Sequence, residues 1–179
     1  MRLFRNLWNF SGTFFLFFHD DAFFPYWREQ LGSHTFLTFG FNPAADISTS
    51  LALQGNTQHF VIKTPKGEIE IELPLLGKHN IQNALAATAA TLAIGIDLSA
   101  IRAGLEKTAP AKGRLQLYQS STGIQVIDDT YNANPFSLQA AVDSLSTFQG
   151  PKIAVLGDMN ELGQEAAALH HEFYSMTGW

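Results

Sequence analysis

The sequence has 179 residues, of which 46% are hydrophobic and 15% charged, and it carries a formal net charge of −5 with no cysteine. These values are typical of a folded globular protein of one large domain or two small ones, and they exclude disulfides and thiolate metal sites. The negative net charge also argues against non-specific nucleic-acid binding as the main activity.

The N-terminal region combines two arginines with a run of phenylalanines. Residues 1–13 lack clear periodicity, Phe14–Phe18 predicts a buried strand, and Phe23–Leu31 predicts a short helix. Arg2 and Arg5 give a faint likeness to a signal peptide, but polar residues interrupt the apolar stretch and no small-residue cleavage site follows. No apolar run is long enough to cross a bilayer. We therefore expect a cytoplasmic protein.

Short alternating runs fill residues 35–75. Glutamate alternates with aliphatic residues in Glu68–Leu73, which predicts a strand with one solvent-exposed face and one packed face. Lys66 and Gly67 separate this run from the alternating run before it, as in a hairpin turn. The region is therefore predicted to be antiparallel β structure.

Helical composition begins after this region. Residues 79–95 are alanine-rich with little charge, which predicts a mostly buried helix that ends at its glycine. Residues 97–109 predict a second helix, and proline and glycine follow it. We place a domain boundary there, with residues 1–112 in one domain and residues 113–179 in the next.

The remaining chain alternates between strands and helices. The expected elements are a strand over 124–127, a helix over 137–148, a strand over 152–156 and a helix over 161–174. This order is typical of a parallel α/β unit, which binds ligands at the carboxyl ends of its strands. Asp128-Asp129 and Gly157-Asp158 follow the two strands, so both pairs are expected to face one crevice.

The stretch V-I-D-D-T-Y-N-A-N-P is unusually polar for the end of a buried strand. A carboxylate there can hold a ribose hydroxyl, a metal or a lysine, and Asn132 and Asn134 can donate and accept hydrogen bonds. Alternatively, these residues serve only as turn and cap residues, with Asn134 capping a helix that starts at Pro135. Both readings stay open for each residue, while the whole string favours a functional site.

Three further polar motifs are ordinary when taken alone. Asn80 and Asn83 share a helix face beside His79 and could contact a base or a ribose, or serve as a cap and a surface residue. Arg114 follows the predicted boundary and could bind a phosphate, or lie free in solvent.

The last motif, V-L-G-D-M-N-E-L-G, places Asp158 and Glu161 between two glycines, as a substrate loop or a simple turn. The sequence contains no G-x-x-x-x-G-K-[ST] phosphate loop, no G-x-G-x-x-G after a strand and no G-x-S-x-G elbow.

The order of these motifs is more specific than any one of them. It resembles that of the Mur ligases over about residues 19–175, through LPLLGKHNIQNALAATAA, KGRLQ, IDDTYNANPFSLQAAV and VLGDMNELG. Within the family, D-D-T-Y-N-A-N-P together with G-D-M-N-E-L-G is similar to the branch that adds D-alanyl-D-alanine, and differs from other Mur ligases and folylpolyglutamate synthases. Two departures are Phe18-His19 before Asp20-Asp21, where the family has Asn-Ala, and residues 1–13, which show no resemblance.

The resemblance implies an α/β fold. We expect the C-terminal part of the central, ATP-binding domain, with an antiparallel β segment and helices, followed by the start of the Rossmann-like parallel α/β domain. The family's phosphate loop, magnesium ligands and carbamylated lysine would precede this sequence. A chain without them is expected not to turn over ATP alone.

The resemblance also implies a reaction in peptidoglycan precursor synthesis. ATP and Mg²⁺ would convert the carboxylate of UDP-N-acetylmuramoyl-tripeptide into an acyl phosphate, which the amine of D-alanyl-D-alanine attacks. By position in the motifs, Arg114 and Asp129 are the implied catalytic residues. The implied ATP contacts are His79, Asn80, Asn83, Arg114, Asp129, Tyr131, Asn132 and Asn134. The implied substrate contacts are Asn134, Asp158 and Glu161, and no metal ligand is assigned in this chain.

Two other functions remain as alternatives. The chain could be a non-catalytic nucleotide-binding or assembly module that pairs with a separate polypeptide containing the phosphate loop. It could also be an unrelated nucleotide-binding Rossmann domain, although the missing glycine fingerprint argues against this.

Overall fold

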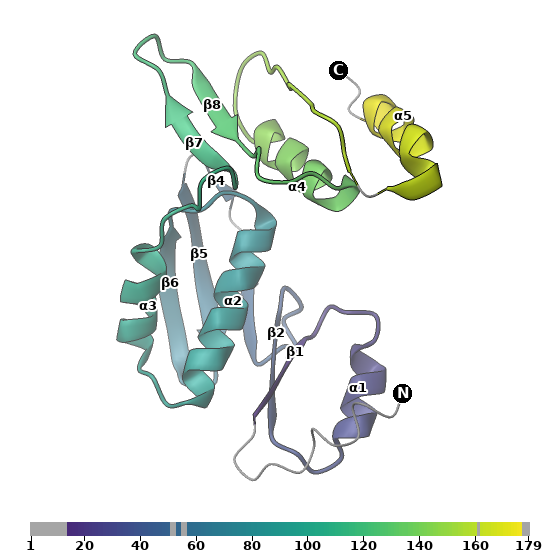
Figure 1. The fold of residues 1–179 in the computed structure, drawn as a ribbon. Helices are drawn as coiled ribbons and strands as arrows, with labels where there is room; N and C mark the ends of the chain where they lie inside the picture. The colour runs from purple at the N-terminus through teal and green to yellow at the C-terminus, as the bar shows by residue number, and fades with distance from the viewer. Residues whose placement is uncertain (1–13, 51–52, 55–56, 161, 177–179) are drawn as a thin grey trace. The chain divides into compact units, whose positions relative to one another are not determined.

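The structure is a computed structural model that describes residues 14–50, 53–54, 57–160 and 162–176 (Figure 1). The chain forms two compact units. The first unit contains the described parts of residues 1–51, 60–71 and 82–105. The second unit contains those of residues 52–59, 72–81 and 106–179. The elements are β1 (Phe15–Phe18), α1 (Phe24–Leu31), β2 (Phe36–Gly40), β3 (Ile47–Ser50), β4 (Leu53–Gln54), β5 (Thr57–Thr64), β6 (Gly67–Leu73), α2 (Lys78–Ala93), α3 (Leu98–Glu106), β7 (Gln116–Gln119), β8 (Gln125–Asp128), α4 (Pro135–Ser146), the 3₁₀ turn η2 (Gly163–Glu165) and α5 (Ala166–Met176).

The main sheet is mixed. Its strands follow the order β1-β2-β3-β5-β4, and β6 pairs with β5. β1 pairs with β2 and β2 with β3 in parallel, whereas β5 runs antiparallel to β3 and β4. The expectation of a wholly antiparallel region was therefore wrong for β2, because α1 returns the chain to the sheet in the direction of β1.

The phenylalanine-rich strand β1 is confirmed, but it is half-buried rather than buried. Its rings pack on one another and on neighbouring elements. Phe17 lies 6.3 Å from Phe24 of α1 and 6.3 Å from Phe36 of β2, measured between ring centroids. Phe14, the residue before β1, is 46% exposed.

The hairpin predicted at Lys66-Gly67 joins β5 to β6. Along β6 the glutamates are exposed while Ile71 and Leu73 are buried, as the alternation predicts. One face of these strands therefore faces the core.

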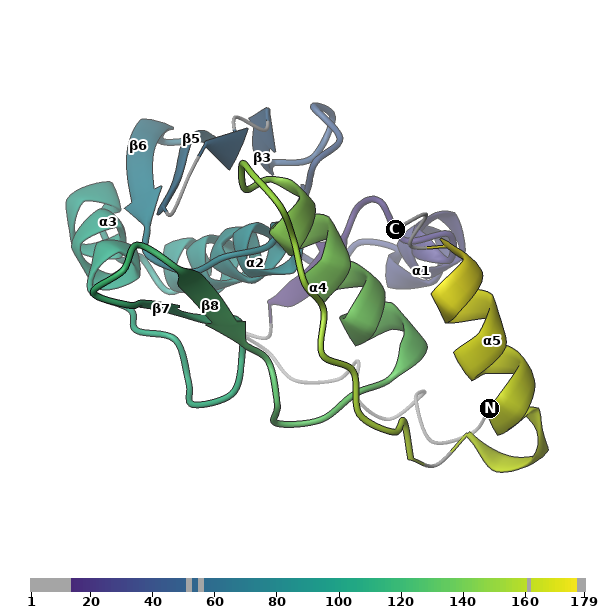
Figure 2. The same ribbon diagram turned by 90° about the horizontal axis from the view of Figure 1, so that it is seen from above.

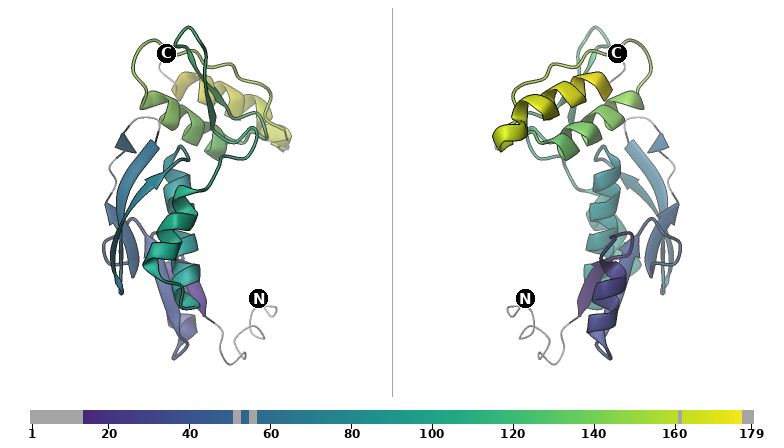
Figure 3. Two further views of the ribbon diagram at one scale, coloured as in Figure 1. Left: turned by 90° about the vertical axis from the view of Figure 1, so that its left-hand side faces the viewer. Right: turned by 90° about the vertical axis from the view of Figure 1, so that its right-hand side faces the viewer.

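Helix α2 supplies the other side of that core. Its buried positions are Ile81, Ala84, Leu85, Thr88, Ala89 and Leu92. This spacing of three and four residues forms a single buried stripe. The predicted helix is therefore confirmed, but it is amphipathic rather than mostly buried, because its other face is half-buried or exposed. α2 and α3 lie on the same side of β5 and β6 (Figures 2 and 3).

The second unit contains a β-hairpin that the sequence did not predict as such. β8 confirms the expected strand near 124–127, and it pairs antiparallel with β7, which was missed. The strand expected over 152–156 was wrong: those residues have no strand conformation, and Ile153 and Val155 are 86% and 93% exposed. A strand requires a hydrogen-bonded neighbour, and the described residues provide none for this stretch. The last helix starts at Ala166, after η2, rather than at residue 161.

Helix α4 begins with the predicted cap. The Asn134 Oδ1 accepts a hydrogen bond from the Ser137 backbone N–H at 2.9 Å, and the Ser137 hydroxyl accepts one from the Asn134 N–H at 3.0 Å. Pro135 occupies the first helical position. This reciprocal pair is a capping box.

Replacing Asn134 by alanine is expected to lower the free energy of unfolding by about 1 kcal/mol, because it removes the side-chain acceptor of the cap. Urea denaturation followed by circular dichroism measures this. Asn132→Ala is the matched control, because Asn132 is exposed and bonds only its neighbour Ala133 within the part of the chain described. Equal losses in the two variants would contradict the capping role.

No helix among the described residues is long and apolar enough to span a membrane.

Candidate functional site

Four of the predicted site residues meet in the second unit. We call His79, Arg114, Asp129 and Tyr131 the linker cluster. They come from the first turn of α2, from the segment before β7 and from the turn after β8. Residues that lie far apart in the sequence are thus brought to one place.

Gly77 allows His79 to lie close to the backbone before α2. The φ angle of Gly77 is +90°, a value that favours glycine. A Cβ atom at this position would lie 2.6 Å from His79 Cε1 and 3.1 Å from Leu115 Cδ1. The imidazole therefore packs over the glycine, beside the segment that carries Arg114.

Gly113 makes a similar close approach to the turn after β8. The Tyr131 N–H donates a hydrogen bond to the Gly113 carbonyl oxygen at 3.0 Å. The φ angle of Gly113 is +70°, and a Cβ atom there would lie 3.0 Å from the Tyr131 nitrogen and 3.3 Å from Thr130 Oγ1. The glycine thus holds the two segments together through the backbone.

Arg114 stacks on Tyr131. The guanidinium carbon lies 4.0 Å from the centroid of the tyrosine ring, within the range of a cation–π interaction. Tyr131 is 67% exposed. The stack holds the guanidinium at the surface, where its N–H groups can bind an anion.

The neighbouring residues Asp128 and Asp129 accept hydrogen bonds from different partners. Asp128 Oδ1 accepts hydrogen bonds from the Thr130 N–H at 3.1 Å and the Thr130 hydroxyl at 2.7 Å, which closes a turn. Asp129 Oδ1 accepts a hydrogen bond from the Leu115 N–H at 3.0 Å. Leu115 has a φ of +50°, the one positive value outside glycine among the described residues. Asp129 therefore fixes a strained residue next to Arg114.

Burial lowers the pKa of His79 from its ordinary value of 6.5, and the negative charge of Asp129 raises it by a smaller amount. A lowered pKa means that the unfolded chain binds a proton more readily than the folded chain. Stability from this residue is therefore present above pH 6.5 and is lost as the pH falls through the lowered folded-state pKa.

Asp129→Asn is expected to lower the pKa of His79 further, because it removes the charge that favours the imidazolium form. An NMR titration of the His79 ring measures the change. His171, which is exposed on α5, serves as the control ring in the same spectra. A rise in the pKa of His79 would contradict the arrangement.

Other predicted residues have local roles or lie elsewhere. Asn80 donates its side-chain N–H to the Leu76 carbonyl oxygen at 2.7 Å, and Asn83 is exposed on α2. Asn132 accepts from the Ala133 N–H at 3.0 Å. Asp158 is exposed and does not take part in the contacts of the linker cluster, and Glu161 lies outside the described residues.

Sequence reasoning missed three residues that support the linker cluster, Gly77, Gly113 and Leu115. The glycines stand inside the motifs G-K-H-N and K-G-R-L, so a glycine next to each functional side chain was the available signal. Nothing in the sequence indicates the positive φ of Leu115.

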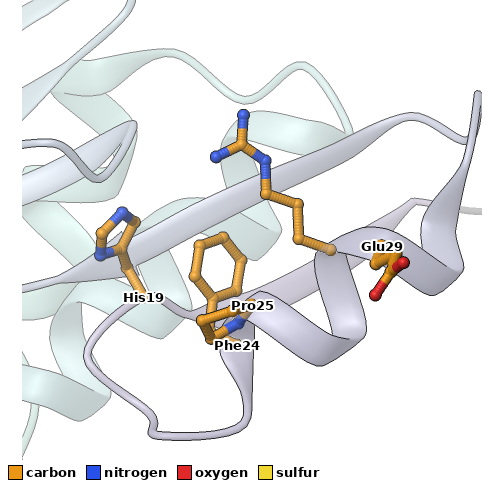
Figure 4. Close-up of a pocket in the computed structure, with 5 residues that line it drawn as sticks. His19, Phe24, Pro25 and Glu29 are labelled. Atoms are coloured by element: carbon orange, nitrogen blue, oxygen red, sulfur yellow. The ribbon is translucent and has the colours of Figure 1, made fainter.

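A separate pocket opens beside α1 (Figure 4). Its lining residues are His19, Phe24, Pro25, Arg28 and Glu29. The rings of His19 and Phe24 lie 4.8 Å apart between centroids. It contains none of the residues that the sequence assigned to the site.

Comparison with known families gives two matches. The Mur ligase middle domain matches residues 1–91, and the glutamate ligase domain of Mur ligases matches residues 113–177. The chain belongs to the Mur ligase family. The first match begins at residue 1, so it includes the segment in which the sequence alone showed no resemblance.

Two similar curated relatives are named UDP-N-acetylmuramoyl-tripeptide–D-alanyl-D-alanine ligases. The UDP-N-acetylmuramoyl-tripeptide–D-alanyl-D-alanine ligase of Haemophilus influenzae is 41% identical over 146 residues, which is 82% of this chain and 32% of that protein. The Escherichia coli ligase is 39% identical over 80% of this chain and 32% of its own length. The resemblance to this branch of the family is thus confirmed. The chain spans about a third of the length of these curated relatives.

Solved structures of the family share the fold. MurF from Acinetobacter baumannii matches with a TM-score of 0.85 and 37% identity, over 94% of this chain and 37% of that chain. MurF from Thermotoga maritima, crystallised with ADP, matches with a TM-score of 0.74 and 23% identity, over 91% of this chain and 37% of that chain. The α/β fold of the Mur ligase middle and C-terminal domains is therefore confirmed for this chain.

Proposed function

We propose that this chain supplies part of the ATP site of a ligase that joins D-alanyl-D-alanine to UDP-N-acetylmuramoyl-tripeptide in peptidoglycan synthesis. One observation carries the proposal. Four residues that the family resemblance assigns to ATP, drawn from three separate segments, lie together in the linker cluster. Chance placement of turn and cap residues does not account for such a meeting.

The cluster has the chemistry that a nucleoside triphosphate requires. The Arg114 guanidinium can pair with phosphate oxygens, and its stack on Tyr131 fixes its direction. Asp129 uses Oδ1 for Leu115, and no hydrogen bond among the described residues engages Oδ2, which can accept from a ribose hydroxyl. In this proposal His79, Asn80 and Asn83 line the adenine side.

The proposed reaction has two steps. A carboxylate oxygen of the tripeptide attacks the γ-phosphorus of ATP, the bond to the β-phosphate oxygen breaks, and ADP leaves with an acyl phosphate formed. The amine of D-alanyl-D-alanine then attacks the acyl carbon, and the tetrahedral intermediate expels phosphate while the amine loses a proton. Arg114 offsets the charge on the transferring phosphoryl group.

The family resemblance implies that the magnesium ligands precede this sequence. The described residues contain no group of three or more histidine, aspartate or glutamate side chains that could hold a metal ion. We therefore assign no step to a metal bound by these residues. Mg²⁺ would enter the site with ATP and would neutralise phosphate charge there.

The proposal extends to the remaining predicted residues. Asn132 and Asn134 would border the nucleotide and the substrate, and Asp158 and Glu161 would lie toward the dipeptide. We place the boundary between the two family domains at residues 112 and 113. Because the proposed substrates are ATP and a nucleotide-linked peptide, the proposed location is the cytoplasm.

A second function has support from the surface of the second unit. Ile153 and Val155 are 86% and 93% exposed on a stretch that pairs with no strand among the described residues, which is typical of a surface that another segment covers. The chain could therefore act as a nucleotide-binding or assembly module that pairs with a separate polypeptide containing the phosphate loop.

Reconstitution tests the proposal. The chain is mixed with a polypeptide comprising the part of the Escherichia coli ligase that precedes the matched region, and ADP and ligated product are measured with Mg-ATP and both substrates. We expect ligation only in the mixture, and we expect Arg114→Ala to reduce it by roughly 100-fold, as for loss of a group that stabilises transferring charge. Asp143→Ala, an exposed carboxylate on α4, is the control.

Three outcomes are informative. Ligation that Arg114→Ala leaves intact would overturn the role of the cluster. A stable complex that binds ATP without ligation would favour the assembly module over the enzyme. Ligation by the chain alone would refute the expectation that it needs the preceding part.

A further inference from the structure

His170 uses both nitrogens of its ring in hydrogen bonds. Its Nε2 lies 3.0 Å from the backbone nitrogen of Met159, and its Nδ1 lies 2.7 Å from the carbonyl oxygen of Ala166. The second contact stays within the first turn of α5. The first reaches back eleven residues to the segment before η2.

The chemistry of the two partners determines which nitrogen of the His170 ring carries the hydrogen. A backbone N–H can only donate, so Nε2 must be the acceptor. A carbonyl oxygen can only accept, so Nδ1 must carry the hydrogen. The geometry therefore requires a neutral imidazole with its proton on Nδ1, because both other forms place a hydrogen on Nε2 that faces the Met159 N–H.

The segment that His170 contacts is mostly exposed. Between residues 151 and 160, Met159 is the buried residue, with 5% of its surface exposed, while its neighbours Asp158 and Asn160 are exposed. Residues 151–160 form no strand with any described residue, so the hydrogen bond of the Met159 N–H to His170 and the burial of the Met159 side chain are the contacts that hold this segment here. They leave the two flanking polar side chains facing solvent.

We propose that His170 is a positioning residue, which in its Nδ1–H form holds the segment Gly157–Asn160 so that Asp158 is presented outward. We call the contact of His170 with Met159 and Ala166 the clamp. That Asp158 is presented toward D-alanyl-D-alanine rests on the proposed function above. The clamp itself does not rest on it, because it depends only on the two hydrogen bonds.

NMR on the intact chain tests the clamp directly. The ¹⁵N shifts of His170 should report a neutral ring protonated at Nδ1 at pH 8, a measurement that needs no variant. A ring protonated at Nε2 would overturn the proposal.

Hydrogen exchange of the Met159 amide gives the second test. His170→Phe should speed exchange by roughly three- to tenfold, the change expected for loss of one hydrogen bond. His170→Gln can place an oxygen near the position of Nε2 and should restore most of the protection. His171→Phe, at the adjacent exposed histidine, should leave exchange unchanged. Unchanged exchange in His170→Phe, or equal effects of His170→Gln and His170→Phe, would overturn the clamp.

Kinetics in the reconstituted ligase separate the clamp from the substrate role. We expect His170→Phe to raise KM for D-alanyl-D-alanine several-fold without changing KM for ATP, and His170→Gln to reverse most of this. If Met159 exchange responds as expected and both KM values stay constant, the clamp stands and the dipeptide-side placement of Asp158 is overturned.

Discussion

Leu85→Ala is expected to lower the free energy of unfolding by about 2–5 kcal/mol, the cost of removing a fully buried leucine side chain. Leu85 lies at the centre of the buried stripe of α2 and has none of its surface exposed. The loss combines the lost transfer free energy with that of the cavity left between the helix and the sheet. Urea denaturation of the two proteins gives the difference.

Ile94→Ala is the control for this substitution. Ile94 follows α2 and is 76% exposed, so the same kind of truncation should change stability by less than about 0.5 kcal/mol. Similar losses for Leu85→Ala and Ile94→Ala would contradict the placement of the core on this face of α2.

Gly113→Val is expected to destabilise the second unit by about 2–4 kcal/mol, and to weaken any nucleotide binding with it. Part of the cost is the positive φ of +70°, which a β-branched residue adopts poorly. The rest is the close approach of the new Cβ to the Tyr131 nitrogen, at 3.0 Å. Thermal unfolding and the signals of Tyr131 and Arg114 in NMR spectra measure both effects.

Gly123→Val separates these two causes. Gly123, in the turn between β7 and β8, has a φ of +85° with no atom within 4 Å of a built Cβ. It therefore carries the backbone strain without the contact. If both variants lost equal stability, the packing of Gly113 against the turn after β8 would not be the reason that position needs glycine.

The helices and the β5–β6 hairpin could be predicted because their signals are local. The spacing of apolar residues in α2 and the alternation in β6 each specify one face of one element. The cap at Asn134 is equally local, because the donor, the acceptor and the proline lie within four residues.

The errors concern elements that depend on distant partners. Residues 152–156 have the composition of a strand, yet strand conformation needs a neighbour that the described residues do not supply. The parallel pairing of β2 with β1 depends on how α1 returns the chain to the sheet, and that of β2 with β3 on the connection between them, which alternation of residues does not encode.

The candidate site was predictable in its members but not in its geometry. The motifs named Arg114, Asp129 and Tyr131, but not the stack of the first on the third. They also could not distinguish Asp128, which closes a turn, from Asp129, which holds Leu115. Two adjacent carboxylates differ here only through the partner each one reaches.

Titration of the purified chain with Mg-ATP by calorimetry tests the central claim most directly, with the fold of each variant checked by circular dichroism. We predict saturable binding at one site that Arg114→Ala and Asp129→Ala each weaken by roughly tenfold or more, as expected for loss of a charge-assisted hydrogen bond, while Asp143→Ala binds as the wild-type chain does. A folded chain that binds no ATP, or that binds it equally well without Arg114 and Asp129, would contradict the claim that the linker cluster is part of a nucleotide site.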